Sequence, residues 1–391
     1  MRRYPGLPVI LAYAAFVLVG TSVGIGGVML LAQIRDYGVN EATIGITFFA
    51  AAAGFFIAGG TAGALIHRFG FRIALAMSAS GFVVVSLIIA TRPAFAVFVA
   101  LQVIVGYVTG VMESVLNAYL AALPNPTTLL NRLHAFFGVG ALLGPVLATW
   151  IVGFTSWPVV WLVLAIAAIP LAAGFVVCYP RRAPDPAPVS AGLLSNALRH
   201  KGVLLGATLL TVYVGLEVGM GNWGYSYLVQ GRGHTDLLAG YTISGYWLGL
   251  TLGRFLLGPI ATRMGATAVG LMFICLTGVT ASAALIWLVP AGAVAIPGLV
   301  VLGFFLGPIF PTAMAVVPRL TTPRLVPTAI GVMNAGSVVG GAALPWLAGV
   351  LIQDAGVWVL LPFTLALALL QTVVWLPMAR RIRASPVPDR A

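Results

Sequence analysis

The sequence predicts an all-α polytopic membrane protein with twelve transmembrane helices in two pseudo-symmetric six-helix bundles. Of the 391 residues, 61% are hydrophobic and only 7% are charged, whereas about a quarter of a soluble domain is charged. The mean hydropathy is +1.08. Apolar runs of about 20 residues, the length that spans a bilayer, recur from end to end. A basic, proline-rich stretch and an internal repeat divide the chain near its middle.

Charged residues, prolines and glycines mark the breaks between the spans. The first span follows a basic start, as in a signal peptide, but its apolar run is too long for one that is cleaved. We therefore interpret it as a transmembrane helix. The twelve predicted spans are 7–33, 42–66, 73–91, 96–123, 131–154, 157–178, 203–229, 237–261, 266–289, 294–317, 327–352 and 357–379.

The basic residues sort to one side of these spans when the N-terminus is placed inside. The inner segments hold Arg2, Arg3, Arg68, Arg72, Arg132, Arg181, Arg182, Arg199, Lys201, Arg263, Arg319, Arg324, Arg380, Arg381, Arg383 and Arg390. The outer segments hold Arg35, Arg92 and Arg232, and Arg254 falls within a helix. This positive-inside pattern predicts a multi-pass protein of the cell (inner or plasma) membrane with both termini cytoplasmic. It also explains the net charge of +12 without nucleic-acid binding.

The stretch "YPRRAPDPAPVSAGLLSNALRHK" divides the chain. Its prolines favour an extended start, and its second half is typical of a short amphipathic helix. We predict an N-terminal bundle over 1–178, a cytoplasmic linker over 179–201, a C-terminal bundle over 202–380 and a cytoplasmic tail over 381–391.

An internal repeat supports the division. "GALIHRFGFR" follows the second span and "GPIATRMGAT" follows the eighth; Gly63, Arg68 and Gly70 match Gly258, Arg263 and Gly265 at one constant offset. "GALLGP" at 140–145 also matches "GGAALP" at 340–345 loosely. Paired halves are typical of transporters that work by alternating access.

The loop "GALIHRFGFR" resembles the signature loop of the major facilitator superfamily, Gly-x-Leu-x-Asp-Arg-x-Gly-Arg-Arg. In that family the aspartate helps to latch the outward-facing state, but His67 stands at its position here. The resemblance makes this loop and its repeat candidates for gating: Gly63, His67, Arg68, Gly70, Arg72, Gly258 and Arg263.

Five further stretches resemble the fucose permease (fucose:proton symporter) group of that superfamily. They are "GVMESVLNAY", "NRLHAFFGVGALLGP", "YVGLEVGMGNW", "GRFLLGPIATRMG" and "GPIFPTAMAVVP", in this order along the chain. The resemblance implies the major facilitator fold and proton-coupled symport of a sugar.

Two of the eight acids, Glu113 and Glu217, lie inside predicted spans. Glu113 is about ten residues from the inner end of its span, roughly 15 Å at 1.5 Å per residue and close to the midplane. A central charge costs about 2.5–3.5 kcal/mol on insertion scales. Because hydrocarbon penalises the charged form of a carboxylate, such a group can take up a proton on one side and release it on the other. We expect both acids to act in proton coupling.

The resemblance implies an acid at the position of Glu113 and a second one in the first helix. That helix has no acid here, and its central polar groups are Thr21 and Ser22. Either Glu113 acts alone or Glu217 is the second site. The alternative for Glu217 is a protonated residue that hydrogen-bonds neighbouring helices.

Polar and aromatic residues near these acids are candidates for a substrate site, in which rings stack on a sugar and amides bind its hydroxyls. They are Asn117, Tyr213, Asn222, Trp223, Tyr246, Trp247 and Asn334. The alternatives are helix packing and an interfacial aromatic belt. For Arg254 we favour a structural or gating role. An anionic substrate is not expected, because no basic residue lies centrally.

These features predict a secondary active transporter, a proton-coupled symporter of a neutral polar solute such as a sugar. The alternatives are proton-coupled export of drugs or amphipathic compounds, since "GALLGP" partly resembles the drug antiporter signature, and lipid flipping. No nucleotide-binding loop, metal-ligand spacing or nucleophile–base pair is found in the sequence. We therefore expect no enzyme activity and no cofactor. We expect the protein to be a monomer. Its expected partners are a small-molecule substrate, protons and the lipid bilayer.

Overall fold

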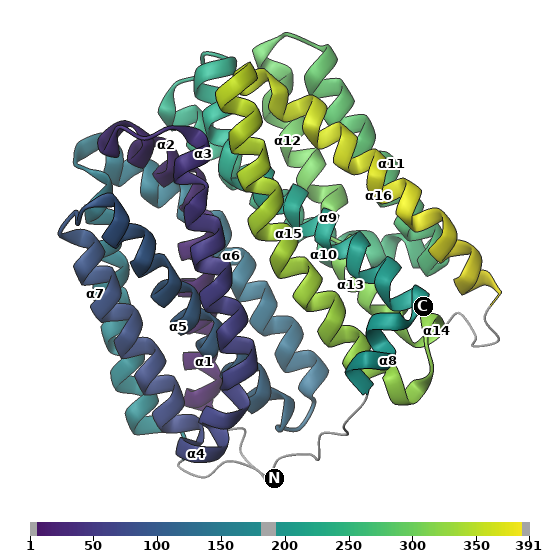
Figure 1. Cartoon of the computed structure of the whole chain (residues 1–391), viewed down its shortest axis with the longest axis horizontal. Helices are drawn as coiled ribbons and strands as arrows, with labels where there is room; N and C mark the ends of the chain where they lie inside the picture. The colour runs from purple at the N-terminus through teal and green to yellow at the C-terminus, as the bar shows by residue number, and fades with distance from the viewer. Residues whose placement is uncertain (1–5, 181–192, 385–391) are drawn as a thin grey trace. The chain divides into compact units, whose positions relative to one another are not determined.

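The computed structural model describes residues 6–180 and 193–384, and these form two compact units (Figure 1). The described residues contain helices and no strands. The first unit comprises α1 (Gly6–Gly24), α2 (Gly26–Tyr37), α4 (Ile46–Ala90), α5 (Phe95–Ala121), α6 (Pro126–Phe154) and α7 (Trp157–Cys178). The second comprises α3 (Glu41–Ile44), α8 (Leu193–Arg199), α9 (Lys201–Ser226), η1 (Tyr227–Gly231), α10 (Asp236–Arg263), α11 (Ala268–Leu288), α12 (Gly292–Leu306), α13 (Ile309–Ala315), α14 (Val317–Leu320), η2 (Pro323–Leu325), α15 (Val326–Ala355), η3 (Val357–Val359) and α16 (Leu360–Arg383).

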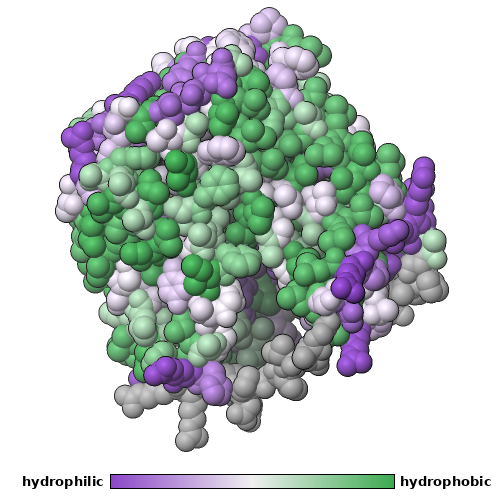
Figure 2. All heavy atoms as spheres, in the orientation of Figure 1, coloured by the Kyte–Doolittle hydropathy of each residue, from purple (hydrophilic) through white to green (hydrophobic). Residues whose placement is uncertain are grey.

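Every predicted span corresponds to a helix or to consecutive helices. Within the described residues, ten helical stretches are long and apolar enough to cross a membrane. One of them, 41–90, contains two predicted spans, and α10, the predicted span 237–261, is not among the ten. Figure 2 shows hydrophobic side chains over the long helices of both units and hydrophilic ones gathered at the helix ends. The predicted amphipathic helix corresponds to α8, whereas linker residues 181–192 and tail residues 385–391 lie outside the described residues.

The repeat predicted from the loops is visible in the backbone. Gly70 interrupts α4 with φ 76° and ψ 170°, so that two helices meet there. Its counterpart Gly265, between α10 and α11, also has φ 76°. Because this left-handed region strongly favours glycine, the same residue type is required at both turns.

Glycines bring α4 against α5 in the first unit and α10 against α12 in the second. A Cβ on Gly54 would lie 1.9 Å from the carbonyl oxygen of Val103, and one on Gly106 would lie 1.9 Å from that of Ala51. In the second unit, a Cβ on Gly253 would lie 1.8 Å from the carbonyl oxygen of Phe304. The backbones touch, as small residues permit in membranes, and α10 and α12 are thereby held in a fixed register.

The matched segments "GALLGP" and "GGAALP" form a second pair of equivalent crossings. A Cβ on Gly140 of α6 would lie 2.0 Å from the carbonyl oxygen of Val17 in α1. A Cβ on Gly340 of α15 would lie 1.9 Å from the carbonyl oxygen of Thr211 in α9. The two units therefore use the same contact between their first and fifth predicted spans.

The predicted span 294–317 is interrupted where α12 ends and α13 begins. Gly307 follows α12, and Pro308 precedes α13. Proline has no backbone N–H, so Pro308 and Pro311 remove helical donors in this segment. The interruption therefore follows from the sequence, and it exposes backbone carbonyls next to α10.

We predict that Gly54→Ala destabilises the protein by about 1–3 kcal/mol, the usual range for overpacking, because the added methyl meets the backbone of α5. Gly59→Ala is the matched control on the same helix, since a Cβ there meets nothing within 4 Å. Thermal unfolding of the two purified variants, followed by circular dichroism, measures the difference. Equal melting temperatures would contradict the packing role of Gly54.

Candidate functional site

The first embedded acid, Glu113, lies inside α5 and is half-buried. Its backbone carbonyl accepts a hydrogen bond from the Asn117 side chain, 2.9 Å away. The Glu113 carboxylate itself has no hydrogen bond or ion pair with any residue that the structure describes. Asn117 is thus turned to the helix backbone, and the carboxylate is left available to a proton or a solute.

The second embedded acid, Glu217 of α9, lies beside Arg254 of α10. A terminal guanidinium nitrogen of Arg254 is 3.9 Å from Glu217 Oε1, and the two side chains are 27% and 14% exposed. At that distance the two groups attract each other electrostatically without a close hydrogen bond. The two predicted roles, proton coupling for Glu217 and gating for Arg254, therefore fall on one ion pair.

Arg254 also contacts the interruption between α12 and α13. Its Nε donates to the carbonyl oxygen of Gly307, 3.3 Å away. A helical carbonyl normally accepts from the residue four positions on, but that residue is Pro311, which has no N–H. Pro311 therefore leaves the Gly307 carbonyl without a donor from its own helix, and Arg254 donates to this carbonyl instead.

Two tyrosines complete the group, which we call the Arg254 cluster: Tyr213, Glu217, Tyr246 and Arg254. The hydroxyl of Tyr246 donates to the backbone carbonyl of Glu217, 2.9 Å away. Tyr213 lies one turn before Glu217 on the same helix face. Its buried hydroxyl faces both charges but forms no hydrogen bond of standard geometry with a described residue. The Tyr213 ring centroid is 6.1 Å from that of Phe310 on α13.

The other predicted substrate residues are not part of this cluster. Trp223 is fully buried, and its indole N–H donates to the Pro345 carbonyl of α15, 2.8 Å away. Trp247 is 4% exposed and packs against Gly221. Asn222 donates to its own helix at the Val218 carbonyl, and Asn334 is exposed on α15. This geometry gives the two tryptophans packing contacts between helices.

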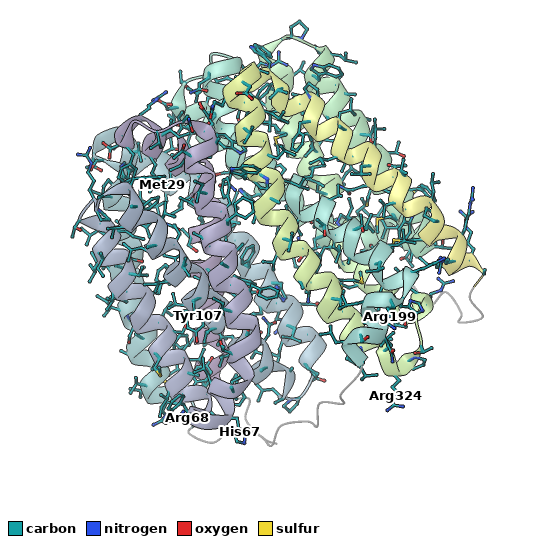
Figure 3. All side chains as sticks on the ribbon, in the orientation of Figure 1. Met29, His67, Arg68, Tyr107, Arg199 and Arg324 are labelled. Carbon is teal, nitrogen blue, oxygen red and sulfur yellow. The ribbon has the colours of Figure 1, made fainter. Side chains whose placement is uncertain are left out.

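The predicted gating residues lie at helix ends, apart from Arg254. His67 and Arg68 are both exposed just before the turn at Gly70 (Figure 3). Arg72 instead points inward, and its Nε donates to the Tyr179 carbonyl, 2.6 Å away, tying α4 to the end of α7. Arg263 is exposed, and a Cβ on Gly63 or Gly258 would meet nothing within 4 Å.

The pairing of Glu217 with Arg254 was missed when each residue was considered alone. The signal was present, because charged residues inside a membrane usually pair with one another, and Arg254 is the only basic residue well inside a predicted span. The sequence did not show which of the two acids it meets. The register of α9 against α10 decides that.

The arrangement can supply one titratable carboxylate without a partner and one polar cluster with opposite charges and aromatic faces. Among the described residues, no group of three or more His, Cys, Asp or Glu side chains is placed to hold a metal ion. The groups that are present can take up a proton at Glu113 and form hydrogen bonds at the Arg254 cluster.

Comparisons with known proteins place this chain in a family. "Bypass of stop codon protein 6" of Saccharomyces cerevisiae is 25% identical over 90% of this chain and 78% of its own length. The "Glucose/galactose transporter" of Brucella abortus is 27% identical over 66% of this chain and 65% of its own length.

Solved structures share the fold. A mutant of the nucleoside transporter NupG matches with a TM-score of 0.80 at 13% identity, over 95% of this chain and 99% of that one. A D-xylose-proton symporter matches with a TM-score of 0.74 at 15% identity, over 94% and 97%. The family model of the Major Facilitator Superfamily matches residues 11–300 and, in a second match, residues 227–390. The chain therefore belongs to the Major Facilitator Superfamily.

Proposed function

We propose that this transporter works by alternating access as a proton-coupled symporter of a neutral polar solute such as a sugar. Both termini and the linker face the cytoplasm in this proposal, with the two bundles bounded as the sequence predicts. The distribution of arginines supports that orientation, and the repeated turns and crossings of the two units support a mechanism built on two similar halves.

The observation that carries the proposal is the surroundings of the Glu113 carboxylate. Its carboxylate lies inside a membrane-spanning helix and has no partner among the described residues. A carboxylate in this position gains stability when it is neutral, and no neighbouring cation is left unpaired when it takes up a proton. Glu217, which faces Arg254, is the poorer proton carrier of the two.

A sugar-like solute is supported by the composition of the Arg254 cluster and by the relatives. The partly exposed charged groups of Glu217 and Arg254 offer hydrogen-bonding partners, and the buried Tyr213 and Tyr246 hold them in place. The Brucella relative is called a glucose/galactose transporter, and one protein of the same fold is a D-xylose-proton symporter. D-glucose, D-galactose and D-xylose are therefore the first solutes to test.

We predict that Glu113→Gln abolishes concentrative uptake while leaving exchange intact. Glutamine keeps the shape of the side chain but carries no titratable proton, so an imposed gradient no longer drives accumulation. Proteoliposomes in an acidic medium, supplied from outside with the three radiolabelled sugars in turn, measure accumulation. Counterflow without a gradient measures exchange. We expect accumulation to fall to the level of protein-free liposomes.

Asp354→Asn is the matched control, because Asp354 is an exposed acid at the end of α15. We expect it to accumulate sugar as the wild type does. Accumulation by Glu113→Gln at the wild-type level would refute the proton-coupling role, whatever the solute.

The direction of the gradient distinguishes symport from the export alternative. We predict that an outside-acid gradient drives sugar into right-side-out vesicles and that an inside-acid gradient does not, because symport moves proton and solute together. An exporter would instead move cationic dyes against the proton flow. Dye extrusion without sugar uptake, measured by fluorescence in the same vesicles, would favour drug export.

A further inference from the structure

Arg254 has more hydrogen-bond donors than the structure uses. A guanidinium carries five N–H groups, and only its Nε makes a hydrogen bond of standard geometry, to Gly307, within the described residues. The contact with Glu217 at 3.9 Å is an ion pair rather than a hydrogen bond. The side chain is 27% exposed and also interacts with the Tyr213 hydroxyl, which still leaves N–H groups without a partner among the described residues.

Glu217 and Tyr213 lie beside these donors. The Glu217 carboxylate is 14% exposed and receives no close hydrogen bond from Arg254. The buried Tyr213 hydroxyl interacts with both Glu217 and Arg254. Tyr213, Glu217 and Arg254 thus interact with one another, but the loose ion pair leaves hydrogen-bonding capacity on both charged groups. Charged groups inside a membrane commonly mark solute pathways, so this spare capacity indicates a place for a ligand.

The ion pair of Glu217 and Arg254 favours hydroxyl groups over anions and zwitterions as ligands. A hydroxyl both donates and accepts hydrogen bonds, so it can accept from Arg254 and donate to Glu217 without separating the two charges. An anion would compete with Glu217 for Arg254, and a zwitterion would have to replace the ion pair on both sides. Two adjacent hydroxyls use the available groups and leave the net charge unchanged.

The half-buried ring of Phe310 adds a surface for the rest of such a ligand. Tyr213 and Phe310 lie with ring centroids 6.1 Å apart, and Tyr246 is held against Glu217 by its hydroxyl. An apolar face of a sugar ring packs well on aromatic rings while its hydroxyls reach the charged groups. The same three helices, α9, α10 and α13, therefore position both kinds of contact.

We infer that the Arg254 cluster binds two adjacent hydroxyls of the solute, with Arg254 as donor and Glu217 as acceptor. This inference rests on the proposed function, because it assigns the residues that bind the hydroxyls of the sugar. Arg254 is then a specificity-determining residue, and Pro311 contributes indirectly by freeing the Gly307 carbonyl that orients it.

The test is equilibrium binding by the full chain in lipid nanodiscs, measured by isothermal titration calorimetry. The ligands are D-glucose, D-galactose, D-xylose and deoxy-glucoses that each lack one ring hydroxyl, with the zwitterion glycine and the anion acetate for comparison. In the wild type, removal of either of two adjacent hydroxyls weakens binding about tenfold to a hundredfold, the range for a hydrogen bond to a charged group.

The informative variant is the double substitution Glu217→Gln with Arg254→Gln, which leaves no unpaired charge in the membrane. We expect it to bind the parent sugar and the two critical deoxy-sugars with equal affinity. Arg324→Gln is the matched control in the same unit, because Arg324 is exposed at a helix end (Figure 3), and it should discriminate as the wild type does. Melting temperatures verify that each variant is folded.

The outcomes separate the two proposals. If the wild type binds no sugar, sugar transport is rejected and the inference falls with it. If the wild type binds sugars but the double variant keeps the same pattern of discrimination, only the diol subsite is rejected. Tighter binding of glycine or acetate than of any sugar would also overturn the subsite, since it would assign the ion pair to charged ligands.

Discussion

Contact between helix backbones at glycine is the interaction on which this structure depends. Lipid tails are as apolar as leucine, so helices in a membrane associate through close packing rather than through exclusion of water. Gly54, Gly106, Gly253 and Gly340 each leave room for a carbonyl of the facing helix. The crossings at Gly253 and Gly340 fix the register of α10 against α12 and of α9 against α15, and the polar residues on these helices depend on that register.

In the Arg254 cluster, helix packing determines where the polar groups lie. Gly253, which touches the Phe304 carbonyl, immediately precedes Arg254. Gly307, whose carbonyl accepts from Arg254, lies so close to α10 that a Cβ there would be 2.3 Å from the Leu250 carbonyl. The residues that bring the two helices together therefore also place the guanidinium and its acceptor. Any side chain at Gly307 would move both.

The fold was predictable from the sequence because hydropathy, glycine and proline act locally. The turn at Gly70 and its repeat at Gly265 were found by matching residues, and both have φ 76°. The interruption after Gly307 likewise follows from local sequence, because Pro308 and Pro311 have no backbone N–H. Side-chain partners were not predictable, because they depend on packing and rotamers that one sequence does not reveal. Examples are the ion pair of Glu217 with Arg254, the hydrogen bond of Asn117 to its own helix and the hydrogen bond from Trp223 to Pro345.

The two embedded acids differ in what protonation does to their surroundings. Protonating Glu217 would leave the positive charge of Arg254 without its counter-charge, and breaking a fully buried ion pair costs about 3–5 kcal/mol. The partial exposure of both side chains lowers that cost but does not remove it. Protonating Glu113 leaves no charged group among the described residues without its counter-charge. The same hydrocarbon that penalises a bare carboxylate therefore acts differently on the two acids, because Glu217 has the counter-charge of Arg254 and Glu113 has none among the described residues.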